Sequence, residues 1–190
     1  MSLRHTIALA GSLLLAGCAV VPGLQPERER IGDFALEARF ALRVSGAERP
    51  AQSSGGRLSW EHRGEQDRLL LANPIGIGLA EIDMRPGRST LRLANGDTRE
   101  STEPESLIEE VTGQRLPVGR LAAWLLGRAS VSGKLTYDSL GRPSRLDEAG
   151  WRIDYGYDLE SSAAAPARLT LSDGQGIELK LRIEEWKEAP

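Results

Sequence analysis

The stretch 34–44, FALEARFALRV, decides the fold class because apolar and charged residues alternate along it. Every even position is apolar, whereas the odd positions include Glu37, Arg39 and Arg43. A period of two is typical of a β-strand with one dry and one wet face. We therefore expect a strand that packs against an apolar layer on one side only.

The same alternation recurs on both sides of a short interruption. Strands are expected around residues 58–60, 80–84, 91–93, 135–137, 151–157, 169–171 and 177–183. Leu69-Leu70-Leu71 is apolar on both faces, which predicts a central or covered strand. Trp186 is out of phase with the strand before it, which predicts a bulge or the strand's end.

Helical spacing occurs only between residues 101 and 127. Ser101 or Thr102 can cap a first helix, Pro104 suits its first turn and Gly113 its end. A second helix is expected over 117–126. Two helices cannot cover so many strands as a flat layer, so we expect the sheet to curl into an incomplete barrel with the helices inside. An interior wider than its side chains fill would be a ligand cavity.

The first residues form a targeting signal. An apolar run, residues 6–16, is too short to span a bilayer and ends in Leu15-Ala16-Gly17-Cys18. This ending resembles the lipobox of bacterial lipoproteins, which implies cleavage before Cys18 and a diacylglycerol and an N-acyl chain on that cysteine. Ala19, in place of an aspartate, implies anchoring at the outer membrane, facing the periplasm. The alternative is an ordinary secretory signal with a chance cysteine.

The chain is expected to divide into three parts. Residues 1–17 are the signal peptide, 18–32 a lipidated N-terminus and flexible tether, and 33–188 a single domain with helices near 104–127. Pro22, Gly23 and Pro26 disfavour regular structure in the tether, and the charged residues 27–30 are expected to be solvated.

Composition argues against several function classes. The formal net charge is −3 with no basic block, which argues against nucleic acid as a partner. After the signal the chain has one histidine, His62, and no thiol besides Cys18, which argues against metal sites and Cys/His catalysis. Gly76-Ile77-Gly78 lacks the third glycine of a dinucleotide loop, since Glu81 holds that position. We expect no enzyme and no cofactor.

A series of motifs gives the chain a family resemblance. They are 34–42, Gly56-Arg57-Leu58-Ser59-Trp60, Asn73-Pro74-Ile75-Gly76, Gly113-Gln114-Arg115-Leu116-Pro117, 121–127, 150–155 and a last strand ending in Trp186. In order and spacing they resemble the LolB family, outer-membrane receptors for lipoproteins in Gram-negative bacteria. The resemblance implies a mainly β (α+β) fold: a curved, antiparallel, open half-barrel with a short helical lid over an apolar cavity.

The resemblance also implies a function and partners. Such a receptor accepts acylated lipoproteins from the periplasmic carrier LolA and inserts them into the outer membrane, so LolA, lipoprotein cargo and outer-membrane lipid are the expected partners, and we expect a monomer. LolA shares the fold but lacks the lipid anchor, so Cys18 favours the receptor. The competing hypothesis is a scaffolding outer-membrane lipoprotein with a filled core and no lipid transfer.

Two groups of site residues follow from the resemblance. Pro74, Ile75 and Gly76 form the expected membrane-insertion loop, where Ile75 stands in place of the family's usual leucine. The alternative is that Ile75 folds back onto the core. The candidate lining of the acyl cavity, which could equally be a filled core, is Phe34, Leu36, Phe40, Leu42, Leu58, Trp60, Leu107, Ile108, Leu121, Trp124, Leu125, Trp151, Ile153 and Tyr155.

The anchor can be tested by changing one residue. The Cys18→Ala variant should remain an unlipidated precursor, because no other thiol is present to accept the lipid. Mass spectrometry of the membrane fraction would detect the acyl chains in the wild type and their loss in the variant. Unmodified Cys18 in the wild-type protein would show that the anchor hypothesis is wrong.

Overall fold

The computed structural model describes residues 27–46 and 50–187. Within these ranges the strands form one antiparallel sheet of eleven strands. Their bounds are β1 (Phe34–Val44), β2 (Gln52–Arg63), β3 (Gln66–Ala72), β4 (Gly78–Arg85), β5 (Arg88–Leu93), β6 (Thr98–Ser101), β7 (Lys134–Tyr137), β8 (Pro143–Glu148), β9 (Trp151–Gly156), β10 (Arg168–Ser172) and β11 (Ile177–Lys187).

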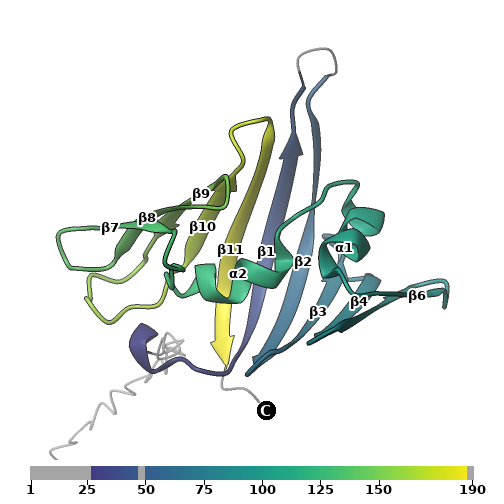
Figure 1. Cartoon of the computed structure of the whole chain (residues 1–190), viewed down its shortest axis with the longest axis horizontal. Coiled ribbons are helices and arrows are strands. Elements are labelled where there is room, and N and C mark those ends of the chain that lie inside the picture. The colour runs from purple at the N-terminus through teal and green to yellow at the C-terminus, as the bar shows by residue number, and fades with distance from the viewer. Residues whose placement is uncertain (1–26, 47–49, 188–190) are drawn as a thin grey trace, which may run out of the picture.

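The first and last strands meet in the middle of the sheet (Figure 1). The strand order is β6-β5-β4-β3-β2-β1-β11-β10-β9-β8-β7, so β1 pairs with β2 on one side and with β11 on the other. β6 and β7 are the two free edges, and they do not pair with each other. The sheet is therefore open, as the sequence predicts.

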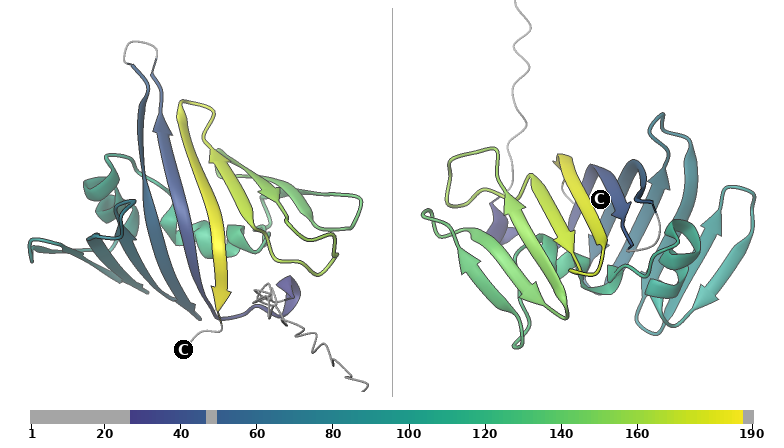
Figure 2. Two further views of the ribbon diagram at one scale, coloured as in Figure 1. Left: turned by 180° about the vertical axis from the view of Figure 1, so that it is seen from behind. Right: turned by 90° about the horizontal axis from the view of Figure 1, so that it is seen from above.

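The chain must cross from one edge of the sheet to the other, and the helices make that crossing. After β6 it forms α1 (Pro104–Thr112) and α2 (Val118–Leu125) before it enters β7. Seen from above, the sheet bends and both helices lie on its concave side (Figure 2). Among the described residues, no helix is long and apolar enough to cross a bilayer.

The residues just before β1 are held against the domain, which corrects the predicted tether. Arg28–Arg30 form a short 3-10 helix, and the Arg28 amide donates to the carbonyl of Ala163 at 2.9 Å. Ile31 is only 6% exposed and belongs to the core. An apolar side chain buried in the core fixes this segment, so the packed domain begins before residue 33.

The strand faces follow the predicted alternation, but the sequence patterns predict neither β6 nor β8. The predicted irregularity near Trp186 is confirmed: the β1–β11 register shifts between Glu37 and Ala38, and Trp186 pairs with inward-facing Leu36. The prediction for residues 69–71 is confirmed, because β3 lies between β2 and β4 and is a central strand. Its outer face is not covered, however, and Leu70 on that face is 42% exposed. The first helix has Glu103 at its N-cap position rather than Ser101 or Thr102.

Candidate functional site

The concave face of the sheet and the two helices enclose one apolar layer. Eleven of the fourteen candidate lining residues are buried there, and Phe40, Trp151 and Tyr155 pack partly buried against the same cluster. The structure thus brings all fourteen together. The side chains of the helices pack directly against the concave face, and we call this conformation the closed state.

Both helices turn their apolar side towards the sheet. In α1 the buried residues are Leu107 and Ile108, and Val111, three residues after Ile108, packs partly buried against the same core. In α2 they are Val118, Leu121, Trp124 and Leu125, three or four residues apart along one face. We call α1, α2 and the segment 113–117 between them the lid.

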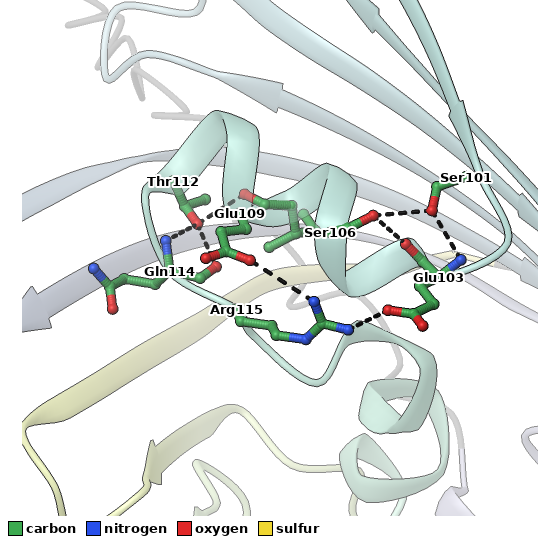
Figure 3. A network of polar contacts seen from close by, with 8 residues as sticks. Ser101, Glu103, Ser106, Glu109, Thr112, Gln114 and Arg115 are labelled. Carbon is green, nitrogen blue, oxygen red and sulfur yellow. Dashed lines mark hydrogen bonds and ion pairs between the residues drawn. The ribbon is translucent and has the colours of Figure 1, made fainter.

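Polar contacts fix the start of the lid to the β6 edge (Figure 3). Ser101, the last residue of β6, accepts a hydrogen bond from the Glu103 amide at 3.0 Å through its Oγ. The Ser106 hydroxyl lies 2.8 Å from the Glu103 carbonyl oxygen and 2.9 Å from Ser101 Oγ. Thus Ser101 contributes to the capping of α1, although it is not the N-cap residue.

The two helices are tied to each other as one unit. Arg115 pairs with Glu103 before α1, and its Nη1 lies 3.9 Å from Glu109 in α1. Glu105 Oε1 accepts a hydrogen bond from the Gly119 amide at the start of α2, at 3.2 Å. A carboxylate at a helix N-terminus accepts a hydrogen bond from a free backbone amide and interacts favourably with the positive end of the helix dipole. The lid is therefore braced internally by charged side chains.

A second set of polar contacts holds α2 to the opposite flank of the sheet. The Tyr155 hydroxyl, on β9, donates to the Trp124 carbonyl at the end of α2, at 2.6 Å. Glu148, on β8, accepts from Arg120 Nη1 of α2 at 3.2 Å and from the Ser130 amide at 3.1 Å. The lid is thus attached by polar groups at both flanks, with apolar contacts in between.

Glu148 is the buried charge of this closure, and its side chain is only 2% exposed. Burial raises its pKa, but hydrogen bonds from the Ser130 backbone and hydroxyl and from Trp124, together with the Arg120 charge, outweigh burial and leave its pKa below the ordinary value of 4.5. The closed state thus favours the carboxylate. Burial also raises the pKa of Tyr155, so its hydroxyl stays protonated and remains a donor.

Part of the predicted lining forms an aromatic cluster at one end of the core. The Phe34 ring lies 5.3 Å from Trp60 and 5.6 Å from Trp186, both edge-on. Asp67 Oδ1 accepts from the Trp60 indole at 2.7 Å and lies 2.8 Å from His62 Nδ1. Asp67 Oδ1 is thus the partner of Trp60 Nε1 and of His62 Nδ1, and the His62 side chain is 15% exposed.

The loop between β3 and β4 holds Ile75 away from the core. The side-chain oxygen of Asn73 accepts hydrogen bonds from the amides of Ile75 at 3.1 Å and Ile77 at 2.9 Å. Pro74 restricts the backbone after Asn73, and Gly76 has φ 91°, which disfavours residues with a Cβ. Ile75 is 81% exposed, so the alternative that it folds back onto the core is wrong.

Sequence reasoning missed two apolar residues and one structural residue of this region. Ile77 and Leu79 are 59% and 44% exposed, and Asn73 organises the turn. The Asn-Pro pair is a turn signal that could have identified Asn73. Cys18 lies outside the described residues.

The fold is that of a known class. The structure is similar to the crystal structure of a LolA superfamily protein from Nitrosomonas europaea, with a TM-score of 0.50, 14% identity, and coverage of 86% of this chain and 90% of that one. A lidded, open antiparallel sheet of this kind therefore defines a protein with the LolA-like fold.

Sequence comparison then identifies the family. The family model described as outer membrane lipoprotein LolB matches residues 32–186. The outer-membrane lipoprotein LolB of Dechloromonas aromatica is 56% identical over the whole of both chains, and that of Halorhodospira halophila is 36% identical over 96% of this chain and 94% of its own. The chain belongs to the LolB family, which confirms the resemblance and agrees with the predicted location at the outer membrane.

The charge of Glu148 predicts a pH dependence of stability. A carboxyl whose folded pKa is lowered stabilises the fold above its unfolded pKa, and this contribution is lost as pH falls through the folded pKa. Glu148→Gln should therefore lower the melting temperature at neutral pH, and the gap to wild type should narrow below about pH 4. Thermal unfolding followed by circular dichroism at several pH values measures both.

The control variant is Glu160→Gln, which removes an exposed carboxylate of the same size. Its melting temperature should follow that of the wild type at every pH. A gap between Glu148→Gln and wild type that stays constant from neutral to acid pH would contradict the role assigned to the charge.

Proposed function

We propose that this protein receives acylated lipoproteins from the carrier LolA, binds their acyl chains between the lid and the sheet, and inserts them into the outer membrane. The observation that carries the proposal is the continuous apolar layer between the lid and the concave face. The polar contacts that hold the lid to the sheet lie only at its two flanks. Membership of the LolB family supports the same role in lipoprotein localisation.

Acyl chains suit this layer because binding needs only apolar surface. Each buried methylene contributes about 0.8 kcal/mol. In the closed state side chains occupy the layer, so binding requires the lid to move away and the chains to replace its contacts. Contacts of the lid with the sheet are exchanged for contacts with the acyl chain, so the net cost of opening is partly offset.

Transfer between two such apolar layers requires no chemical energy source. A tenfold bias towards the receptor corresponds to only about 1.4 kcal/mol. The final step places the acyl chains in the bilayer, where they are buried at least as well. The proposed activity is therefore non-enzymatic.

A lipid on Cys18 would keep the domain at the membrane during delivery. A single acyl chain gives only reversible binding, whereas several chains hold a protein firmly. The tether expected between Cys18 and the packed segment at Glu27 and Arg28 would give the domain some reach from the surface. Outer-membrane location follows from the family, and the anchor explains the presence of a single cysteine.

One observation favours the competing role as a scaffold. All fourteen candidate residues pack in one closed cluster, as they would in an ordinary filled core. A filled core binds no lipid, whereas a lidded cavity does. Binding of a fluorescent acyl probe to the protein therefore separates the two functions.

The acyl site can be tested on α2, which has one buried and one exposed position close together. Leu121→Glu places a charge in the apolar layer and should weaken binding of a fluorescent fatty-acid probe by about tenfold or more, because an unpaired buried charge is costly. Ala123→Glu adds the same charge on the exposed side of α2 and should bind like the wild type. Probe titration measures both affinities.

Circular dichroism would first establish that both variants fold. A folded Leu121→Glu variant with wild-type probe affinity would contradict an acyl site at this position. Absence of probe binding by the wild type itself would favour the scaffold.

A substitution in the exposed loop tests whether delivery to the membrane can be impaired while acceptance from LolA is retained. Ile75→Glu should still accept a lipoprotein from LolA but release it into liposomes about tenfold more slowly, because a charge resists entry into hydrocarbon. Ile75→Leu should behave like wild type. Crosslinking to cargo measures acceptance, and flotation of cargo with liposomes measures delivery. Loss of acceptance in Ile75→Glu would contradict a role confined to delivery.

A further inference from the structure

Exposed apolar side chains gather around the end of β3, the loop after it and the start of β4. Among the described residues, eight large apolar side chains are exposed, and four of them lie within ten consecutive residues of β3, the following loop and β4. These four, Leu70, Ile75, Ile77 and Leu79, are 42%, 81%, 59% and 44% exposed. We call them the outer apolar patch.

A bulge at the base of the loop gives the patch its shape. Leu71 pairs with Ala80 but Ala72 pairs with Gly78, so Leu79 is an extra residue in β4. Ala80 is buried on the concave side, which leaves Leu79 on the outer face with Glu81. Leu70 pairs directly with Glu81, so Leu70 and Leu79 are diagonal neighbours on that face.

Three acidic groups near the patch, Glu81, Asp83 and Asp97, are each paired with an arginine. Arg68 lies 2.8 Å from Glu81, and Arg92 lies 2.9 Å from both Glu81 and Asp83. Asp97, on the turn after β5, lies 3.8 Å from Arg99. These pairings reduce the repulsion that anionic lipid would meet at this surface. Glu61 on β2 lies opposite Arg68 in the register but makes no ion pair in the described part of the chain.

A cationic side chain adjoins the patch on its other side. Arg57 on β2 pairs with Ala72, the last residue of β3 before the loop, and it is exposed. No ion-pair partner for Arg57 is found in the described part of the chain. Apolar side chains flanked by an available guanidinium match a bilayer surface, where hydrocarbon lies beneath anionic headgroups.

We propose that the outer apolar patch, and not Ile75 alone, is the surface that contacts the bilayer, with Arg57 bound to lipid headgroups. The proposal rests on the membrane role of the loop given above and extends it to the outer face of β3 and β4. It implies that the domain leans this face onto the membrane, rather than touching it with the loop tip only. Leu70 and Leu79 are then contact residues in their own right.

Depth-sensitive fluorescence tests the proposal on the full lipidated chain. Cys18 carries the lipid, so Leu70→Cys, Ile75→Cys and Leu79→Cys each introduce one reactive thiol for an environment-sensitive dye. Leu140→Cys and Leu159→Cys are matched controls, since these residues are 41% and 47% exposed on the opposite flank of the sheet. The vesicles contain phosphatidylethanolamine and phosphatidylglycerol with nitroxide-labelled acyl chains.

Dyes at 70, 75 and 79 should be quenched about twofold or more relative to dyes at 140 and 159. If the dye at position 75 were quenched but the dyes at positions 70 and 79 behaved like the controls, this inference would be overturned. The membrane role proposed for the loop at Ile75 would then still stand. Absence of quenching at all three would overturn the loop's membrane role as well.

The contribution of Arg57 is measured with the dye at position 79. Adding Arg57→Gln should reduce quenching in vesicles that contain phosphatidylglycerol and leave it unchanged in purely zwitterionic vesicles, because only the former attract the guanidinium. Equal quenching with and without Arg57 in the anionic vesicles would show that the headgroup contact is wrong.

Discussion

The pairing of β1 with β11 is the constraint on which the rest of the structure depends. It joins two series of neighbouring strands, one running outwards from β1 to β6 and one running inwards from β7 to β11. Because the centre of the sheet is occupied by the ends of the chain, the middle of the chain must connect the two outer edges. The helices lie on that connection, so the lid is a consequence of the strand order and not an addition to it.

The same connection explains how the lid is attached. Its first half continues from β6 and is fixed there by Ser101, while its second half is held to β8 and β9 through Glu148 and Tyr155. Between these flanks the contacts are apolar and non-directional. Such contacts can be exchanged for those of another apolar molecule, whereas the polar attachments have defined partners.

Local patterning in the sequence predicts nine of the eleven strands, because apolar side chains recur along them. It misses β6, whose four residues are all polar, and β8, where Leu146 has no apolar residue two positions away. The alternation in Phe34–Val44 appears directly in its burial, and the phase change at Trp186 marks a real bulge. What local patterning leaves open depends on neighbours elsewhere in the chain. The run of three leucines is compatible with a central or a covered strand, and β3 is central with no element over its outer face at Leu70.

In the candidate site, too, features that depend on the local sequence could be predicted, whereas features that depend on distant parts of the chain could not. The apolar residues of the lid and sheet could be named from their spacing, and the resemblance to a family gave Ile75 its expected role. Neither source predicts that Ile31 is buried, because its burial involves residues that are distant in the sequence, in the same segment where the Arg28 amide bonds to the Ala163 carbonyl. The extra residue in β4 likewise follows from pairing register, which alternation alone does not specify.

The central position of β1 also determines the order in which the molecule can assemble. Ala38 pairs with Ile183, so the seam that unites the two halves of the sheet forms only when almost the whole chain is present. Non-local pairing of this kind is slow to form, because a long loop must close first. Until then β1 has an unpaired edge rich in apolar residues, which is prone to aggregate. The free edge of β1 is therefore the place where an incomplete chain is most open to non-native strand pairing until β11 arrives.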